Sequence, residues 1–154
     1  MSIPIIEIIA ADIEKAVNAI TVANGYNQIL TAVRVNVEDF DDAPAVDGRV
    51  LIVQLDEEIP EKQPIQGRDV LQTFALVAFV INSDKAAGSV DTRRNQVKAD
   101  IIKKLLIDPY RSTYAIDTII HEAVFFKDNQ SYTGVTVPVE IHYRTKHDDP
   151  YTKL

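Results

Sequence analysis

The histidines and the acids beside them are the side chains best suited to metal or acid–base chemistry. His121-Glu122 begins like the His-Glu-x-x-His zinc motif, but the second histidine is missing, because Phe125 stands in its place. His142 and His147, followed by Asp148 and Asp149, are five residues apart across the end of an expected strand. That spacing matches no common zinc-ligand pattern. We therefore predict no metal site.

The sequence also contains no motif typical of a catalytic nucleophile or of a phosphate-binding loop. The chain has no cysteine, which excludes disulfides, thiolate ligands and cysteine nucleophiles. No serine lies in a Gly-x-Ser-x-Gly elbow, and the five glycines form neither a phosphate loop nor a dinucleotide fingerprint. The paired acids Asp41-Asp42 and Glu57-Glu58 are neighbours on loops, with nothing to set an acid opposite a base. We predict no enzyme, no catalytic residue and no cofactor.

The acidic side chains are concentrated in one stretch. Between Glu38 and Glu61 there are nine acids and one base, Arg49, so that this stretch carries −8 and the rest of the −7 chain about +1. Such a field repels phosphate, so we expect no nucleic-acid binding. Two interpretations stay open. The acids either keep loops solvated, or they form an acidic face, including Asp41, Asp42, Glu57 and Glu58, toward a basic partner or a DNA channel.

Targeting signals are not evident. The apolar start Met1–Ile9 lacks a basic region and already carries Glu7, the opposite of the charge order of a signal peptide. The longest apolar run, around Phe74–Ile81, has the length of a strand and falls short of a membrane span. We expect a product made in the cytoplasm, with no membrane partner.

The 154 residues predict one domain, 1–154, with a polar C-terminal arm at about 145–154. Apolar residues recur every three or four positions in two stretches, which predicts helices at Ile3–Ala23, closed by Asn24-Gly25, and at Val90–Ile107, closed by Asp108-Pro109. Alternating or continuous apolar runs predict five strands: Ile29–Val37, Arg49–Leu55, Val70–Ile81, Thr118–Phe126 and Tyr132–Tyr143. The order α-β-β-β-α-β-β predicts an α+β fold, a largely antiparallel (mixed) sheet with two helices packed on it.

Three details complete this expectation. Lys127–Gln130 is a candidate hairpin turn between the last two strands, and Asn82–Ser89 is expected to be a small polar turn. Pro138 lacks an N–H, which places its strand at an edge or at a bulge.

The apolar strand surface exceeds what two helices would cover. Val70–Ile81 is apolar on both faces, and Ile120, Val124 and Phe126 share one face of the next strand. The second face of the sheet therefore needs a further layer or another subunit, and exposed apolar patches mark such interfaces. We predict a subunit interface that includes these three residues.

Two other segments have open alternatives. Arg94 lies in line with the apolar stripe of its helix, where either its stem packs while the guanidinium reaches water, or it meets a partner at a subunit boundary. The segment Asp148, Asp149, Pro150 and Tyr151 is either a frayed terminus or an arm that docks on a neighbour.

Four stretches resemble the tail-terminator (tail-completion or minor tail) proteins of long-tailed bacteriophages: Ala19–Asn27, Arg49–Pro60, Val97–Pro109 and His142–Tyr151. They look like that family's helix running into Asn-Gly-Tyr, its apolar strand with an acidic loop, its second helix with an Asp-Pro stop, and its closing strand with a short arm. Together they span most of the chain. The family has no catalytic residues and no fixed contact motif to carry over.

The resemblance implies a structural virion protein, made in the bacterial cytoplasm, that assembles as a six-membered ring. Its expected partners are copies of itself, the tail tube protein and the head-completion or connector protein. Two other functions stay open: a head–tail connector of the neck, or a small oligomeric adaptor or ligand-binding module unrelated to phage.

Overall fold

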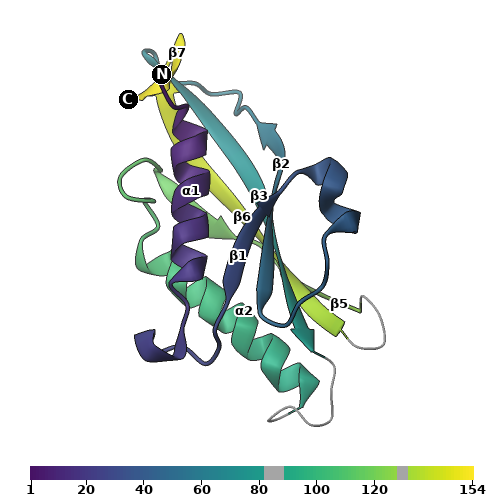
Figure 1. Cartoon of the computed structure of the whole chain (residues 1–154). Helices are drawn as coiled ribbons and strands as arrows, with labels where there is room; N and C mark the ends of the chain where they lie inside the picture. Colours follow the sequence, from purple (N-terminus) through teal and green to yellow (C-terminus); the bar gives the residue numbers. More distant parts are fainter. Residues whose placement is uncertain (82–88, 128–131) are drawn as a thin grey trace.

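The computed structural model describes residues 1–81, 89–127 and 132–154, without the side chains of Asp41 and Asp42. This part of the chain is an α+β fold, as predicted, with two α-helices on a seven-stranded mixed sheet (Figure 1). The elements in chain order are α1 (Ile5–Asn18), the 3₁₀ helix η1 (Val22–Asn24), β1 (Thr31–Val35), the 3₁₀ helix η2 (Val37–Asp42), β2 (Arg49–Glu58), β3 (Gly67–Ile81), α2 (Val90–Ile107), β4 (Asp117–Ile120), β5 (Val124–Lys127), β6 (Tyr132–Lys146) and β7 (Asp149–Lys153).

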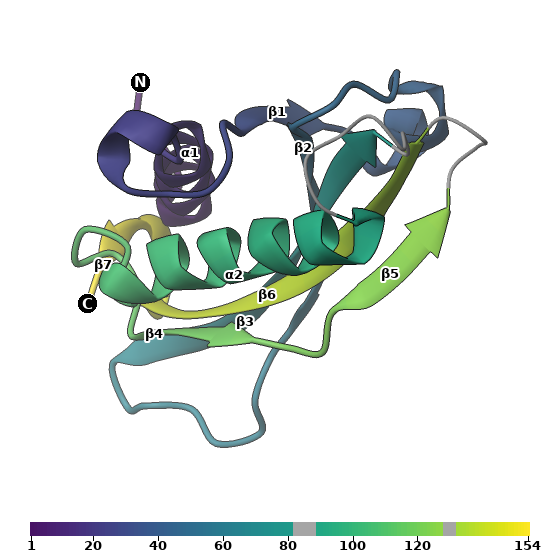
Figure 2. The ribbon, with the colours of Figure 1, turned by 90° about the horizontal axis from the view of Figure 1, so that it is seen from below.

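The long strands β3 and β6 form the centre of the sheet. They pair antiparallel along their whole length, from Gly67↔Lys146 to Ile81↔Tyr132. Strand β2 pairs antiparallel with the other edge of β3, and β1 pairs parallel with the first half of β2. Along the free edge of β6 lie β7, β4 and β5, all antiparallel to it; Figure 2 shows β4 and β5 following one another at this margin.

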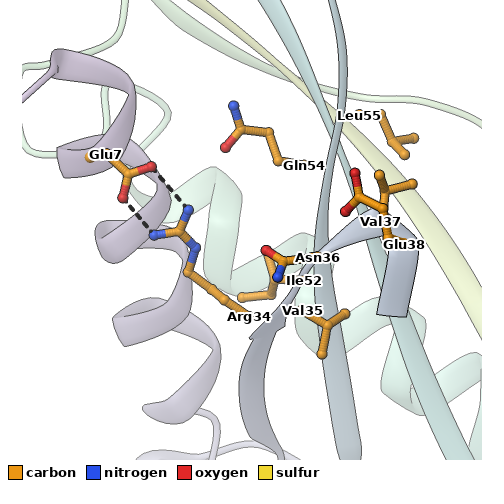
Figure 3. A pocket seen from close by; sticks show the side chains of 9 residues that line it. All are labelled: Glu7, Arg34, Val35, Asn36, Val37, Glu38, Ile52, Gln54 and Leu55. Atoms are coloured by element: carbon orange, nitrogen blue, oxygen red, sulfur yellow. Dashed lines mark hydrogen bonds and ion pairs between the residues drawn. The ribbon is translucent and has the colours of Figure 1, made fainter. Parts of the chain in front are cut away.

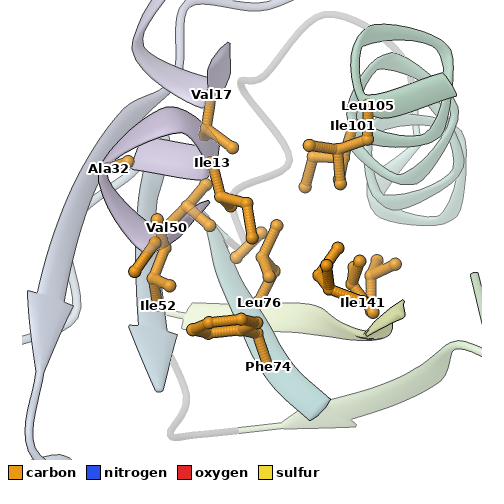
Figure 4. Close-up of a cluster of buried hydrophobic side chains, with 14 of the residues drawn as sticks. Ile13, Val17, Ala32, Val50, Ile52, Phe74, Leu76, Ile101, Leu105 and Ile141 are labelled. Atoms are coloured by element: carbon orange, nitrogen blue, oxygen red, sulfur yellow. The ribbon is translucent and has the colours of Figure 1, made fainter. Parts of the chain in front are cut away.

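Both helices cover one face of the sheet, here called the inner face. The apolar stripe of α1 (Ile5, Ile9, Ile13, Val17) and that of α2 (Val97, Ile101, Leu105) pack on alternate residues of β2, β3 and β6 (Figure 4). Helix α2 has the predicted bounds because Ser89 Oγ accepts the Thr92 N–H at 3.2 Å and Asp108-Pro109 ends it. Helix α1 ends at Asn18, earlier than predicted, and a separate turn, η1, leads to Gly25 with φ +89°.

The opposite, outer face is partly covered from within the chain, which is the first of the two predicted alternatives, a further layer or another subunit. The expected solvated loop after β1 forms η2 and the residues behind it. Phe40, Ala43 and Ala45 from this segment pack on Leu51, Val53, Ala75, Val77 and Phe79. Figure 1 shows η2 on the far side of β1 and β2 from α1. A further layer from the chain itself thus covers the apolar half of this face, and another subunit is not required there.

The predicted strand Thr118–Phe126 is interrupted. Pairing passes from Ile120↔Val139 to Val124↔Thr136, four positions on one strand against three on the other, so the side chains change face. The break lies opposite Pro138, whose carbonyl accepts the His121 N–H at 2.9 Å but which has no N–H to return. Although β6 lies inside the sheet, its proline thus faces the gap between two short edge strands.

The expected C-terminal arm is a strand. β6 continues to Lys146, and after a tight turn β7 pairs back on Thr145 and Lys146. The last residue also pairs, since Leu154 N–H donates to the carbonyl of Arg144. The N-terminus, the C-terminus and β7 lie at the same end of the molecule (Figure 1). The expected turn at 82–88 and the hairpin tip at 128–130 lie outside the described residues.

Candidate assembly surface

An apolar cavity opens on the outer face, beside the margin formed by β5. It has a volume of about 350 Å³ and is lined by Phe40, Ala43, Val77, Phe79, Phe126, Lys127 and Thr136. The rings of Phe79 and Phe126 meet edge to face, with centroids 5.8 Å apart and planes at 89°. We call this the outer cavity. It lies where η2 stops covering the sheet and β5 begins.

Strand β5 continues the apolar surface to the edge of the sheet. Its Val124 side chain is 60% exposed and Phe125 is 45% exposed. Val124 and Phe126 lie on the outer face, whereas Phe125, paired with Val135, lies on the inner face beneath α2. Of the three residues predicted to share a face, Val124 and Phe126 do so. Ile120 does not, because it pairs with Val139 and packs half-buried against the inner core.

Arg94 has partners within its own chain. Its guanidinium carbon lies 4.8 Å from the centroid of the Phe125 ring, one Nη donates to Thr133 Oγ1 at 3.1 Å, and the other pairs with Asp91. Lys98 adds a second cation, with Nζ 5.6 Å from the same ring centroid. The guanidinium thus packs on Phe125 and is paired within its own chain at the β5 margin. It neither simply reaches water nor needs a partner from another subunit, the two alternatives that the sequence left open.

A second hollow lies at the opposite margin of the sheet. It has a volume of about 460 Å³ and opens where β1 ends while β2 continues; it is lined by Glu7, Arg34, Val35, Asn36, Val37, Glu38, Ile52, Gln54 and Leu55 (Figure 3). Two hydrogen bonds of 2.9 and 3.2 Å join Arg34 to Glu7, and this pairing holds the pKa of Glu7 below its usual value. We call this the β2 hollow.

The acidic end of β2 follows a β-bulge. The register shifts between Gln54 and Glu57, and the buried Gln72 donates from Nε2 to the freed carbonyl of Leu55 at 2.6 Å. Glu57 and Glu58 are exposed beyond the bulge. Glu57 adds to the effect of burial that raises the pKa of Tyr143 to about 12. The side chains of Asp41 and Asp42 lie outside the described residues, so only half of the predicted acidic face is placed.

The predicted docking segment Asp148–Tyr151 forms the turn into β7 and its first residues. Asp149 accepts hydrogen bonds from Thr152 Oγ1 at 2.5 Å and from the Tyr151 N–H at 3.0 Å, and these bonds hold the pKa of its carboxyl below the usual value. The Tyr151 side chain is about half exposed. The segment is therefore ordered by its own chain, and none of its residues lines either hollow described above.

The histidines contact acids without assembling a centre. His142 Nε2 lies 3.2 Å from Asp69 Oδ2, and His121 Nε2 lies 3.7 Å from Glu140 Oε2. In the described part of the chain, no three such side chains gather into a group that could hold a metal ion. The helices described there include none that is long and apolar enough to cross a membrane.

Sequence analysis missed two buried polar residues, Asp100 and Arg111, that join distant elements of the fold. Asp100 accepts from the N–H and the Nδ2 of Asn27, at 2.9 and 3.1 Å, and so fixes the turn before β1 to α2. Arg111, 1% exposed, lies in the loop after α2. The signal for Asp100 was available: an acid next to Ile101, on the apolar side of its helix. Arg111 carried no signal, because its partners are distant in sequence.

No family model matches the chain, and no curated protein matches it. No family is assigned to the chain on this basis.

Proposed function

We propose that the chain is a structural subunit of a bacteriophage or prophage tail, one that caps the tail tube as a ring, stops tail polymerisation and provides the head-side joining surface. The content of the proposal comes from the four stretches that resemble tail-terminator proteins. Two of these stretches meet in the fold, because Asn27 of the first is bound by Asp100 of the third. The role is non-catalytic and belongs to the virion, after synthesis in the host cytoplasm.

The observation that carries the proposal is the uncovered apolar margin at β5. Val124, Phe125 and the outer cavity expose apolar surface at one edge of the sheet, beside the part of the outer face that η2 covers. Monomeric proteins rarely expose such edge strands, because they pair with other chains. The proposed partners are copies of the chain, the tail tube protein and a head-completion or connector protein.

Deleting the gene from a genome that carries it tests the proposal. We expect tails of uncontrolled length and few tails joined to heads in electron micrographs, with rescue by the wild-type gene. Purified protein, alone or on tail tubes, should form particles of six times the 17.2-kDa chain mass by mass photometry. Tails of normal length joined to heads in the deletion strain would contradict the role. Short tails without overlong ones, and heads left unjoined, would favour the neck connector instead.

A second test of the proposed ring asks whether its acidic residues line a channel for DNA. An acidic lining would let DNA pass without binding, and Glu57 and Glu58 are exposed on β2. Replacing Asp41, Asp42, Glu57 and Glu58 with lysine should then lower infectivity. Normal infectivity of this variant would count against an acidic channel.

The outer cavity favours one other function, a small ligand-binding module. Its volume of about 350 Å³ and its aromatic lining are within the range of small-molecule sites. A stable dimer that binds an apolar dye in this cavity, and loses it when Ala43→Trp fills the space, would favour that function over a ring.

A further inference from the structure

The second half of β2 lies at an edge of the sheet, where no strand pairs with its outer side in the described part of the chain. Pairing with β1 ends at Val35↔Val53, whereas pairing with β3 continues to Glu58↔Leu71. Among the described residues, Gln54–Glu58 thus has a strand neighbour on one side only. The β2 hollow lies against this edge and leaves room for an added segment, because the chain turns away into η2.

Strand β5 is the matching edge at the opposite margin. It pairs with β6 on one side, and in the described part of the chain no strand lies on its other side. Two other marginal strands carry their own protection. Asn18 Oδ1 accepts the N–H of Ala32 at 2.8 Å, so α1 shields β1, and Pro150 interrupts the donors of β7.

The charges at the two edges are complementary. Asp56, Glu57 and Glu58 form the exposed end of β2, with Glu38 at the hollow. Around β5, the described charged residues include the cations Lys98 and Lys127 and the acid Glu122, while Arg94 and Asp91 pair with each other.

The apolar side chains also match. On β5 Val124 and Phe125 are exposed, and at the β2 hollow Leu55 is 41% and Val37 is 55% exposed.

We propose that β5 of one copy adds to the Gln54–Glu58 edge of β2 in a second copy, so that the sheets of successive copies are continuous. Main-chain hydrogen bonds supply the pairing, apolar contacts to Leu55 and Val37 bury Val124, and Lys127 meets the acids of β2. The two edges are different surfaces on opposite margins, so the contact is head to tail and can close into a ring. The inference rests on the proposed role of the chain as a ring subunit and names the surfaces of that ring.

Cysteine cross-linking tests the pairing directly, because the natural chain has no cysteine. Glu58→Cys and Lys127→Cys are made separately, mixed in equal amounts and treated with a short bismaleimide. We expect cross-linked dimers in the mixture, little product from either variant alone, and a ladder of multimers from the double variant. The matched control is Lys153→Cys on the exposed strand β7, which should not cross-link to Glu58→Cys. Equal yields from both mixtures, or efficient cross-linking of Glu58→Cys to itself, would overturn the proposal.

Charge exchange provides an independent readout. Glu57→Lys with Glu58→Lys should raise the dissociation constant of self-association, measured by sedimentation velocity, by about tenfold, because like charges then face each other. Adding Lys98→Glu and Lys127→Glu to the same chain should restore it. Thermal melts identify any variant that has lost its fold. Weakened association without rescue would show that these charges do not face one another and would overturn the pairing.

The outcomes separate this inference from the proposed function. A wild-type chain that stays monomeric both in free solution and on tail tubes overturns the pairing between copies, while overlong tails in the deletion strain still support the terminator role. Pairing through β5 and β2 together with normal tails in the deletion strain overturns only the terminator role.

Discussion

The Arg111 guanidinium and the Asp12 carboxylate form an ion pair of 3.1 Å that joins two segments 99 residues apart. Asp12 lies in the middle of α1 and Arg111 in the loop after α2. The same guanidinium donates to the carbonyl oxygens of Leu105 and Asp108, and so caps the end of α2. Burial lowers the pKa of Arg111, and the negative charges of Asp12 and Asp108 oppose that effect. One side chain thus fixes α2 to α1 over the inner face.

Removing the carboxylate should therefore cost much of the stability. We expect Asp12→Ala to lower the free energy of unfolding by about 3 kcal/mol, because it leaves a buried guanidinium without its counter-charge. Urea denaturation measures this. Glu7→Ala is the matched control on the same helix, since the Glu7–Arg34 pair is largely exposed and should contribute less than about 1 kcal/mol. Equal losses in the two variants would show that Arg111 is not held by Asp12.

The loop that carries Arg111 has three successive residues with positive φ: Arg111 at 46°, Ser112 at 56° and Thr113 at 75°. This conformation is costly for a β-branched residue. We expect the exposed Thr113→Gly to raise the free energy of unfolding by about 0.5–1 kcal/mol. Ala99→Gly on the exposed face of α2 should lower it by about 1 kcal/mol. Differential scanning calorimetry of both variants checks the sign, and a loss in Thr113→Gly would contradict the strain.

The sequence predicted the elements whose pattern is local. Helix α2 has its predicted bounds because Ser89 and Pro109 delimit a periodic stripe, and β3 could be read from continuous apolar residues. The segment that covers the outer face was not identified, because the acids around Phe40 dominate that stretch. The apolar residues Phe40, Ala43 and Ala45 were the available signal, but their contacts with β2 and β3 are set by the path of the chain in space.

The candidate surface was predicted only in part, because a local sequence pattern indicates some of its residues and not others. Val124 and Phe126 were assigned by alternation, which holds within β5, but Ile120 was assigned across a break that alternation alone does not reveal. The sequence analysis did note that Pro138 has no N–H to donate and expected its strand to lie at an edge or to carry a bulge. Its consequence fell on the neighbouring strand, because β6 itself keeps its register with β3 throughout. The β2 hollow was missed, since it depends on β1 ending before β2.

Acid should weaken the fold through Asp69. Its carboxylate accepts from Arg144 Nε at 2.5 Å and Nη2 at 3.0 Å, and Arg144, with a smaller effect of His142, holds the pKa of Asp69 below its usual 3.8. Because the folded pKa is the lower one, this contribution to stability is complete above about pH 4 and is lost as the pH falls through the folded pKa. We expect Asp69→Asn to be less stable at neutral pH and to lose less stability on acidification.

Urea denaturation across that pH range checks the prediction for Asp69. Glu7→Gln provides the comparison, since the lowered pKa of Glu7 arises from an exposed pair with Arg34 that salt screens. Parallel pH profiles of the wild type and Asp69→Asn would contradict the assignment.

Gly134 links the stability of the sheet to the outer cavity. It lies on β6 opposite Phe79 and Phe126, and a Cβ there would be 2.1 Å from the Ala78 carbonyl oxygen and 2.5 Å from Phe126 Cζ. We expect Gly134→Ala to lower the free energy of unfolding by about 2–3 kcal/mol, because either β3 or the Phe126 ring must move.

Gly25→Ala is the control for Gly134→Ala, since Gly25 has φ +89° and open space around it, so only the conformational cost of about 1 kcal/mol remains. Displacing Phe126 shifts β5, so Gly134→Ala should also weaken self-association measured by sedimentation velocity, whereas Gly25→Ala should not. Unchanged association in a folded Gly134→Ala protein would mean that the β5 margin does not make the contact between copies.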